Sequence, residues 1–286
     1  MRGGPHPRLA LALGGGGARG LAHIGVLQAL QEAHVQIDAV AGTSIGAIVG
    51  GVYAAGGDAR DRGRHLARLL AAAPRSPLPN GRPQRGVRTW LDTAAYLRHD
   101  VFGLGLHSGA DLELAIEAWV GSRRIEDLAI PFVALATDVL SGEPVRLDHG
   151  RLARAVHASA AMPGVFQPVT IDGRVLVDGG VVENIPVAAA RELGADVVLA
   201  VSVSPSLERT TPRTGLGLLA RSEQIRASHM EARDLLLADL QLRVPVPHSV
   251  GLFDFDRAGP IIALGRAAMQ TALEDLEALL ARQLPA

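Results

Sequence analysis

The sequence predicts an α/β protein built around a mainly parallel sheet. Short apolar runs typical of buried strands alternate along the chain with stretches whose apolar residues recur at helical spacing. Near the N-terminus this gives the order strand, helix, strand, helix, and strands joined by a crossover helix run parallel. The chain has 286 residues, of which 48% are hydrophobic, so it is long and apolar enough to form one large domain.

The N-terminal elements have the clearest patterns. Residues 8–13 (RLALAL) predict a short buried strand, and the apolar spacing that follows the glycines predicts a helix ending near Ala33. Residues 37–41 (IDAVA) predict a second strand, and residues 45–55 predict the helix after it. A glycine-containing turn stands between strand and helix in both pairs.

Residues 58–107 differ from the rest of the chain. They are rich in arginine, proline and glycine, with one helical stretch near residues 64–73. Such an insertion is long for a simple connection between two elements, so it is expected to form a lid or cap.

The later elements are marked by turn signals and by β-branched residues. Asp172–Gly173 predicts a tight hairpin turn, and Pro186 predicts the start of a helix. Further helices are expected over residues 108–120, 152–159, 187–193, 222–240 and 260–284, and further strands over residues 131–137, 144–147, 169–171, 174–177, 197–203 and 242–246.

The composition excludes several classes of function. A net charge of −1 provides no basic field for nucleic acid, so we expect no such partner. The absence of cysteine excludes disulfides, thiolate catalysis and cysteine-based metal sites, and all 28 basic residues are arginine, so P-loop and Schiff-base chemistry lack their lysine. The N-terminal residues lack the apolar core of a secretion signal, so a cytoplasmic protein is expected. No pattern indicates an oligomeric state.

Ser44 is the candidate nucleophile. It lies in the pentapeptide Gly42-Thr43-Ser44-Ile45-Gly46, which matches Gly-x-Ser-x-Gly between a predicted strand and a predicted helix, the context of a nucleophile elbow. Gly42 and Gly46 leave room for the crossing backbones, and the N-terminus of the helix favours negative charge at the serine. The alternative is a glycine-rich turn with an incidental serine.

Residues 14–20 (GGGGARG) form a second motif, between the first strand and the first helix. Successive glycine N–H groups can point at one anion, here the oxyanion formed when Ser44 attacks a carbonyl. The run also matches the Gly-x-Gly-x-x-Gly dinucleotide fingerprint, so nucleotide binding by the Gly15–Gly20 loop is the competing interpretation. That fingerprint requires an acid at the end of the second strand, whereas Asp38 lies at its start.

The third motif, Asp178-Gly179-Gly180, follows the predicted strand over residues 174–177. A carboxylate at a strand end, beside two glycines, can reach a neighbouring loop without steric obstruction. The alternative is that Asp178 closes a turn, because the Asp-Gly pair is a common turn former.

Together and in this order, the three motifs resemble those of the patatin-like phospholipase family, especially its compact bacterial members. The resemblance implies that Ser44 is the nucleophile and that Asp178 completes a Ser–Asp dyad. It also implies that Gly15, Gly16 and Gly17 form the oxyanion hole. Smaller matching features are Ala136-Thr137-Asp138, the Ala158–Pro163 block (ASAAMP) and Asn184-x-Pro186.

The resemblance further implies a three-layer α/β/α patatin-like fold, with the catalytic domain over residues 8–204. Residues 205–286 carry no matching motif and are expected to form a mainly helical region packed on the same domain. The implied activity is hydrolysis of acyl esters of lipids, such as phospholipids, lysophospholipids or acylglycerols, without metal or cofactor and with transient contact to a membrane surface. A catalytically silent scaffold that keeps the fold is a further alternative.

Two points of mechanism follow from the residues. A carboxylate of ordinary pKa, about 3.9, is a weak base, so partial desolvation would have to raise the pKa of Asp178. A conventional triad would need a histidine, and chain order leaves His229 and His248, neither of which lies in a motif, while His23 is expected to pack. Arg19 either positions the glycine loop or binds a phosphate headgroup, and its place beside the loop favours positioning.

Overall fold

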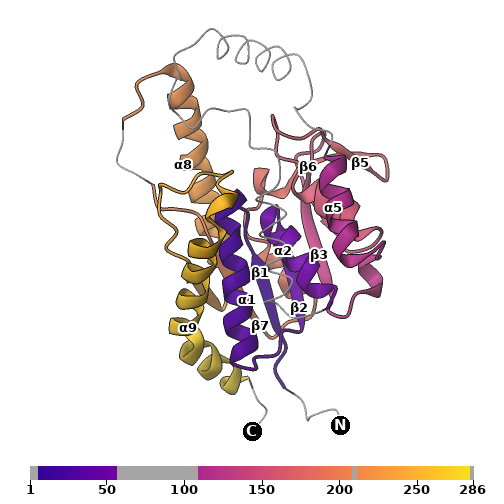
Figure 1. The fold of residues 1–286 in the computed structure, drawn as a ribbon, viewed down its shortest axis with the longest axis vertical. Helices are drawn as coiled ribbons and strands as arrows, with labels where there is room; N and C mark the ends of the chain where they lie inside the picture. Colours follow the sequence, from indigo (N-terminus) through magenta and orange to yellow (C-terminus); the bar gives the residue numbers. More distant parts are fainter. Residues whose placement is uncertain (1–5, 57–108, 208–210, 284–286) are drawn as a thin grey trace.

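The computed structural model describes residues 6–56, 109–207 and 211–283. An eight-stranded sheet forms its centre (Figure 1). The strands are β1 (Leu9–Leu13), β2 (Ala39–Thr43), β3 (Phe132–Asp138), β4 (Pro144–Leu147), β5 (Val169–Ile171), β6 (Arg174–Asp178), β7 (Val197–Ser202) and β8 (Leu240–Arg243).

The sheet is mixed but mainly parallel, as the sequence predicts. Its strands pair in the order β5-β6-β3-β2-β1-β7-β8, and β4 also pairs with β3. β3, β2, β1, β7 and β8 pair in parallel along this order, whereas the pairings of β3 with β4, β3 with β6 and β5 with β6 are antiparallel. The carboxyl ends of the parallel strands therefore share one edge, which carries the glycine loop and Ser44.

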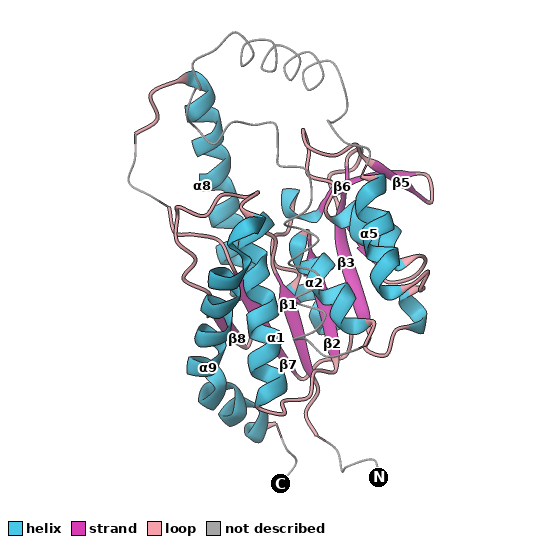
Figure 2. Ribbon diagram, viewed as in Figure 1, coloured by secondary structure: helices cyan, strands magenta, loops and turns pink. Residues whose placement is uncertain are grey.

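Helices cover both faces of the sheet (Figure 2). The α-helices of the described residues are α1 (Ala22–Glu32), α2 (Ile45–Ala54), α5 (Ala110–Val120), α6 (Leu152–Ser159), α7 (Val187–Glu192), α8 (Gly215–Leu235) and α9 (Ala258–Arg282). Short 3-10 helices are η1 (Gly17–Leu21), η2 (Ile125–Asp127), η3 (Gly179–Val181) and η4 (Phe255–Arg257).

Alternation along β1 shows how the two faces differ. Leu9, Leu11 and Leu13 belong to the larger buried cluster, which includes side chains of α1, α2, α5, α6 and α9. Ala10 and Ala12 belong to the second cluster, which includes side chains of α7 and the end of α8. Successive side chains of a strand point to opposite faces, so each face has its own helical layer. The predicted three-layer α/β/α fold is confirmed.

The C-terminal helix α9 packs closely on α1 because both helices carry glycine where they meet. A Cβ atom at Gly25 would lie 1.9 Å from the carbonyl oxygen of Ile262, and one at Gly265 would lie 1.9 Å from the carbonyl oxygen of Ala22. No side chain fits at either distance. With β8 paired to β7, the residues after 204 extend the same sheet and the same core.

Several predicted boundaries move. β2 spans 39–43 rather than 37–41, in register with β1 from Ala39 to Gly42. α8 spans 215–235 rather than 222–240, so β8 begins at 240 rather than 242. Asp239 explains this end, because its Oδ2 accepts hydrogen bonds from the Val198 N–H at 2.7 Å and from Arg191 at 2.5 Å. Those long-range bonds draw the chain into the sheet, which helical periodicity cannot reveal.

The insertion expected over residues 58–107 lies outside the described residues. Of the helices that are described, none is both long enough and apolar enough to cross a membrane.

Candidate active site

Ser44 occupies a strained turn between β2 and α2. Its backbone has φ 55° and ψ −122°, a conformation that residues other than glycine rarely adopt. The turn is tight enough to exclude side chains on both sides. A Cβ at Gly46 would lie 2.1 Å from the carbonyl oxygen of Leu13, and one at Gly42 would lie 2.5 Å from the backbone nitrogen of Ala47. The glycines of the pentapeptide are thus a steric requirement of the elbow.

A residue for which the sequence predicts no role holds the elbow. The N–H of Ser44 donates a hydrogen bond of 3.0 Å to Oγ of Ser159, which is fully buried at the end of α6. The ASAAMP block contains this serine, but nothing in the sequence indicates its partner. Ser159 therefore satisfies a buried donor at the strained residue.

Asp178 reaches Ser44 because two strands share one edge of β3. Ala134 pairs with both Gly42 and Leu147, and Ala136 pairs with both Val145 and Asp178. β4 occupies one edge of β3 at both positions, so β2 and β6 follow one another along the other edge. They run in opposite directions and meet end to end. The residues at this junction are Ser44, just after β2, and Asp178, the last residue of β6.

The two side chains are in direct contact. Ser44 Oγ donates a hydrogen bond of 2.6 Å to Asp178 Oδ2, and the residues are only 8% and 6% exposed. The other carboxylate oxygen, Oδ1, accepts the N–H of Gly180 at 2.8 Å. Burial raises the pKa of Asp178 to about 6, against the opposing effect of these two hydrogen bonds. The desolvation that a carboxylate base requires is present.

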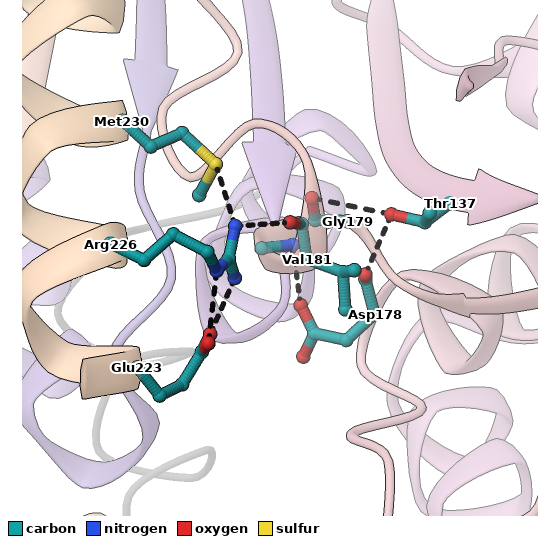
Figure 3. Close-up of polar contacts among 8 residues, drawn as sticks. Thr137, Asp178, Gly179, Val181, Glu223, Arg226 and Met230 are labelled. Carbon is teal, nitrogen blue, oxygen red and sulfur yellow. Dashed lines mark hydrogen bonds and ion pairs between the residues drawn. The ribbon is translucent and has the colours of Figure 1, made fainter. Parts of the chain in front are cut away.

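The turn after Asp178 is braced from two sides (Figure 3). From β3, Thr137 Oγ1 donates a hydrogen bond of 2.9 Å to the carbonyl oxygen of Asp178. From α8, Arg226 donates a hydrogen bond of 2.9 Å to the carbonyl oxygen of Val181, and the same guanidinium pairs with Glu223. α8 is therefore bonded directly to the segment that carries the carboxylate.

The glycine loop lies beside Ser44. A Cβ at Gly15 would be 3.4 Å from Cβ of Ser44, and Gly16 and Gly17 have φ values of 156° and 58°. The N–H of Gly15 donates a hydrogen bond of 3.1 Å to the carbonyl oxygen of Asn184. The N–H of Gly15 is therefore already hydrogen-bonded in this structure. The amides of Gly16 and Gly17 donate no hydrogen bond to any described residue.

Asn184 links the glycine loop to the Asp-Gly-Gly segment. Besides accepting from Gly15, it donates through Nδ2 to Glu231 Oε2 at 2.8 Å and through its backbone N–H to Asp234 Oδ2 at 2.9 Å. Glu231 and Asp234 are buried residues of α8, and burial raises the pKa of Asp234 to about 6. The sequence indicates Asn184 only as part of a family-like motif, because its partners lie about fifty or more residues away along the chain.

The histidines considered as triad members do not contact the dyad. His229 and His248 are exposed, and Asp178 makes its described side-chain hydrogen bonds with Ser44 and Gly180. His23 is fully buried and pairs through Nε2 with the carbonyl oxygen of Gly14 at 2.8 Å. Burial lowers the pKa of His23 to about 4, so its neutral ring donates this bond and fixes the glycine loop.

The contacts of Arg19 and Asp38 show where these two side chains lie relative to the glycine loop. Arg19 Nε donates a hydrogen bond of 2.9 Å to the carbonyl oxygen of Val250, and burial lowers the pKa of Arg19. Asp38 accepts the N–H of Leu9 at 2.8 Å, at the start of β1 and thus at the opposite end of the sheet from the glycine loop. It cannot serve as the acid of a dinucleotide site there. Within the described residues no cluster of histidine and carboxylate groups is suited to a metal ion.

The sequence is similar to several known proteins. The model of the patatin-like phospholipase family matches residues 11–191. An uncharacterised NTE family protein of Mycobacterium bovis is 41% identical over 206 residues, which is 72% of this chain and 52% of that protein. The lysophospholipase nte1 of Emericella nidulans is 33% identical over 208 residues, 72% of this chain and 12% of that protein.

Among solved structures, VipD from Legionella pneumophila is 15% identical, with a TM-score of 0.48 over 94% of this chain and 67% of that one. The chain spans about half the length of the mycobacterial relative and a small part of the fungal one. Since the family model covers well over half of the sequence, the chain belongs to the patatin-like phospholipase family.

Proposed function

We propose that this protein is a serine hydrolase that cleaves acyl esters of lipids with a Ser44–Asp178 dyad. The observation that carries the proposal is the 2.6 Å hydrogen bond from Ser44 Oγ to Asp178 Oδ2 at a strained, buried elbow. A serine paired with a base, at the N-terminus of a helix and beside a glycine loop, is the arrangement that nucleophilic acyl transfer requires.

The chemistry runs in two halves. Ser44 Oγ attacks the ester carbonyl carbon as its proton passes to Asp178 Oδ2, giving a tetrahedral oxyanion. The oxyanion collapses, the bond to the alcohol oxygen breaks, and the alcohol leaves with the proton from Asp178. A water molecule then attacks the acyl-serine, again giving its proton to Asp178, and the acid is released while Ser44 regains its proton. Asp178 thus acts in turn as base and acid.

The oxyanion is stabilised beside the glycine loop. We assign the donors to the N–H groups of Gly16 and Gly17, because the N–H of Gly15 is bonded to Asn184. The N-terminus of α2 adds favourable potential, since Ser44 is its N-cap. One such donor is typically worth about 2.7–4 kcal/mol of transition-state stabilisation. Gly15, with no side chain beside Ser44, keeps the approach to the serine open.

The lipid nature of the substrate is supported by family membership and by a relative named as a lysophospholipase. Phospholipids, lysophospholipids and acylglycerols all present the acyl ester that the dyad would cleave. These substrates reside in membranes or micelles, so the reaction is placed at a lipid surface. The mechanism needs no metal or cofactor to activate the serine.

A fluorophosphonate probe tests the nucleophile. The wild type and Ser228→Ala, which changes an exposed serine of α8, should be labelled, and Ser44→Ala should not. The same three proteins are assayed on p-nitrophenyl esters of increasing chain length and on lysophospholipid. Labelling or turnover that survives in Ser44→Ala would contradict the proposal. A wild type that is folded, unlabelled and inactive would show a silent scaffold.

A further inference from the structure

Large exposed apolar side chains gather around the N-terminal half of α8. Leu218 is 58% exposed, Leu219 is 70% exposed and Ile225 is 40% exposed. Leu218 and Ile225 are seven residues apart, close to two helical turns, so they align along one stripe of the helix. Glu231 and Asp234, further along α8, are buried and bond to the body of the protein. The apolar stripe therefore faces away from the core.

This half of α8 lies at the edge of the sheet that carries the active site. α8 leads into β8, and β8 runs parallel to β7, so the helix starts near the carboxyl ends of the strands and descends to their beginnings. Figures 1 and 2 show its first turns projecting beyond the sheet at this end. Another exposed apolar tip, Val139–Leu140, follows the carboxyl end of β3 at the same edge, with exposures of 51% and 83%.

The charges around the stripe are mainly positive. Residues 213–226 carry three arginines and one acidic residue. Arg226 pairs with that acidic residue, Glu223, so Arg213 and Arg221 give the region its positive charge. Apolar side chains flanked by arginines suit a phospholipid surface, where the arginines meet phosphate groups and the leucines enter the acyl boundary. The same mixture suits a purely apolar protein partner less well.

The position of α8 is also fixed relative to the dyad. Arg226 bonds the carbonyl oxygen of Val181, in the turn that follows Asp178 (Figure 3). Asn184, next to that turn, bonds Glu231 of the same helix. A lipid surface that contacts the exposed apolar side chains of α8 would therefore lie at a fixed distance from Ser44.

We propose that Leu218, Leu219 and Ile225, with Arg213 and Arg221, form a docking face for a phospholipid bilayer. The proposal rests on the proposed function, because it assigns the surface from which the lipid ester enters the active site. Val139–Leu140 forms a second contact at the same edge.

Vesicle flotation tests the docking face. The full chain carrying Ser44→Ala is used, so that vesicles are not hydrolysed and binding is measured independently of catalysis. The vesicles contain either phosphatidylcholine alone or equal parts of phosphatidylcholine and phosphatidylglycerol. The test pair is Leu218→Ser/Leu219→Ser. The matched control is Leu236→Ser/Leu237→Ser, which changes two leucines of similar exposure, 77% and 59%, just after the C-terminal end of α8.

Loss of two inserting leucines should weaken partitioning by about tenfold or more, whereas the control pair should bind like its parent. Binding of the parent should be stronger to the anionic vesicles, and Arg213→Gln/Arg221→Gln should remove that preference. With Ser44 intact, the Leu218→Ser/Leu219→Ser variant should retain turnover of a soluble short-chain ester and lose turnover of vesicle lipid.

Three outcomes would overturn the proposal. In the first, the parent protein does not float with either vesicle, and in the second, the test and control pairs lose vesicle binding equally. In the third, the test pair floats normally, but analytical ultracentrifugation shows that its substitutions turn a dimer into a monomer. That last result would assign the stripe to a second copy of this chain. A wild type inactive on soluble esters would refute the proposed function, while the flotation result would still stand or fall separately.

Discussion

Asp178 Oδ2 lies 2.6 Å from Ser44 Oγ, although the two residues are 134 positions apart in the chain. No described cation pairs with this carboxylate, which is only 6% exposed and held by a hydroxyl and an amide N–H. As the proposed base, Asp178 would thus be activated by burial rather than by a histidine. Several measurable properties follow from this relationship and from the packing around it.

The pH dependence of turnover reports on Asp178. Burial raises the pKa of Asp178 to about 6, and only the carboxylate can accept the serine proton. We expect kcat/KM for a soluble ester to rise with pH through about 6 and then level off. Burial also raises the pKa of Glu183 to about 7, so Glu183→Gln is the control and should leave the acid limb in place. If the acid limb of the pH profile shifts in Glu183→Gln, the titrating group is Glu183 and the prediction for Asp178 is wrong.

Asp178→Asn should lower activity and raise stability. Loss of the general base should reduce kcat/KM by about 10²–10⁴-fold. In the unfolded chain Asp178 titrates near an ordinary pKa of about 3.9, whereas in the folded protein its pKa is about 6. The folded state therefore loses stability as pH rises from about 4 to about 6, and the loss persists above that range.

Asparagine does not ionise and keeps the shape of the side chain. At pH 8 we expect Asp178→Asn to be more stable than the wild type by about 1–3 kcal/mol, with the difference shrinking towards pH 4. Urea unfolding at the two pH values measures this. If the variant is inactive and also less stable than the wild type at pH 8, the carboxylate of Asp178 stabilises the folded state.

Asn184 should affect catalysis through position. Asn184→Ala removes the donor to Glu231, a carboxylate that is 4% exposed, and should cost about 1–3 kcal/mol of unfolding free energy. We expect kcat to fall more than KM changes, because the glycine loop loses a support rather than a substrate contact. Asn184→Asp places a second carboxylate against Glu231, so its stability should improve on lowering the pH from 8 to 5. Equal stability of Asn184→Asp at both pH values would contradict this contact.

Gly46 provides a steric test of the elbow. Gly46→Ala would bring a Cβ to 2.1 Å from the Leu13 carbonyl oxygen, so backbone must move, and we expect a loss of more than about 3 kcal/mol or failure to fold. Gly259→Ala is the matched control, because a Cβ there meets nothing within 4 Å in an exposed helix turn, and it should be neutral or stabilising. Thermal unfolding distinguishes the two. A Gly46→Ala protein as stable as the control would mean that the elbow relaxes freely.

Local patterns in the sequence carry much of the fold and part of the site. The hairpin around Asp172–Gly173 and the strand Pro144–Leu147 lie where turn and alternation signals place them. The C-terminal end of α8 does not lie where the sequence predicts it, because Asp239 bonds to Val198 and Arg191, which are far along the chain. Short-range propensity cannot register such a bond.

The sequence alone determined that Ser44 and Asp178 each lie at the carboxyl end of a strand and among glycines, since both features arise within a few residues. Only the tertiary structure decided that β2 and β6 meet along one edge of β3, which brings the two side chains together. It also decided that the N–H of Gly15 donates to the carbonyl oxygen of Asn184 and that Ser159 accepts the N–H of Ser44. These contacts depend on strand register and helix packing, which join residues tens to more than a hundred positions apart. A local pattern can place a residue at the end of a strand, but the partner it meets there is selected by the burial and pairing of the whole sheet.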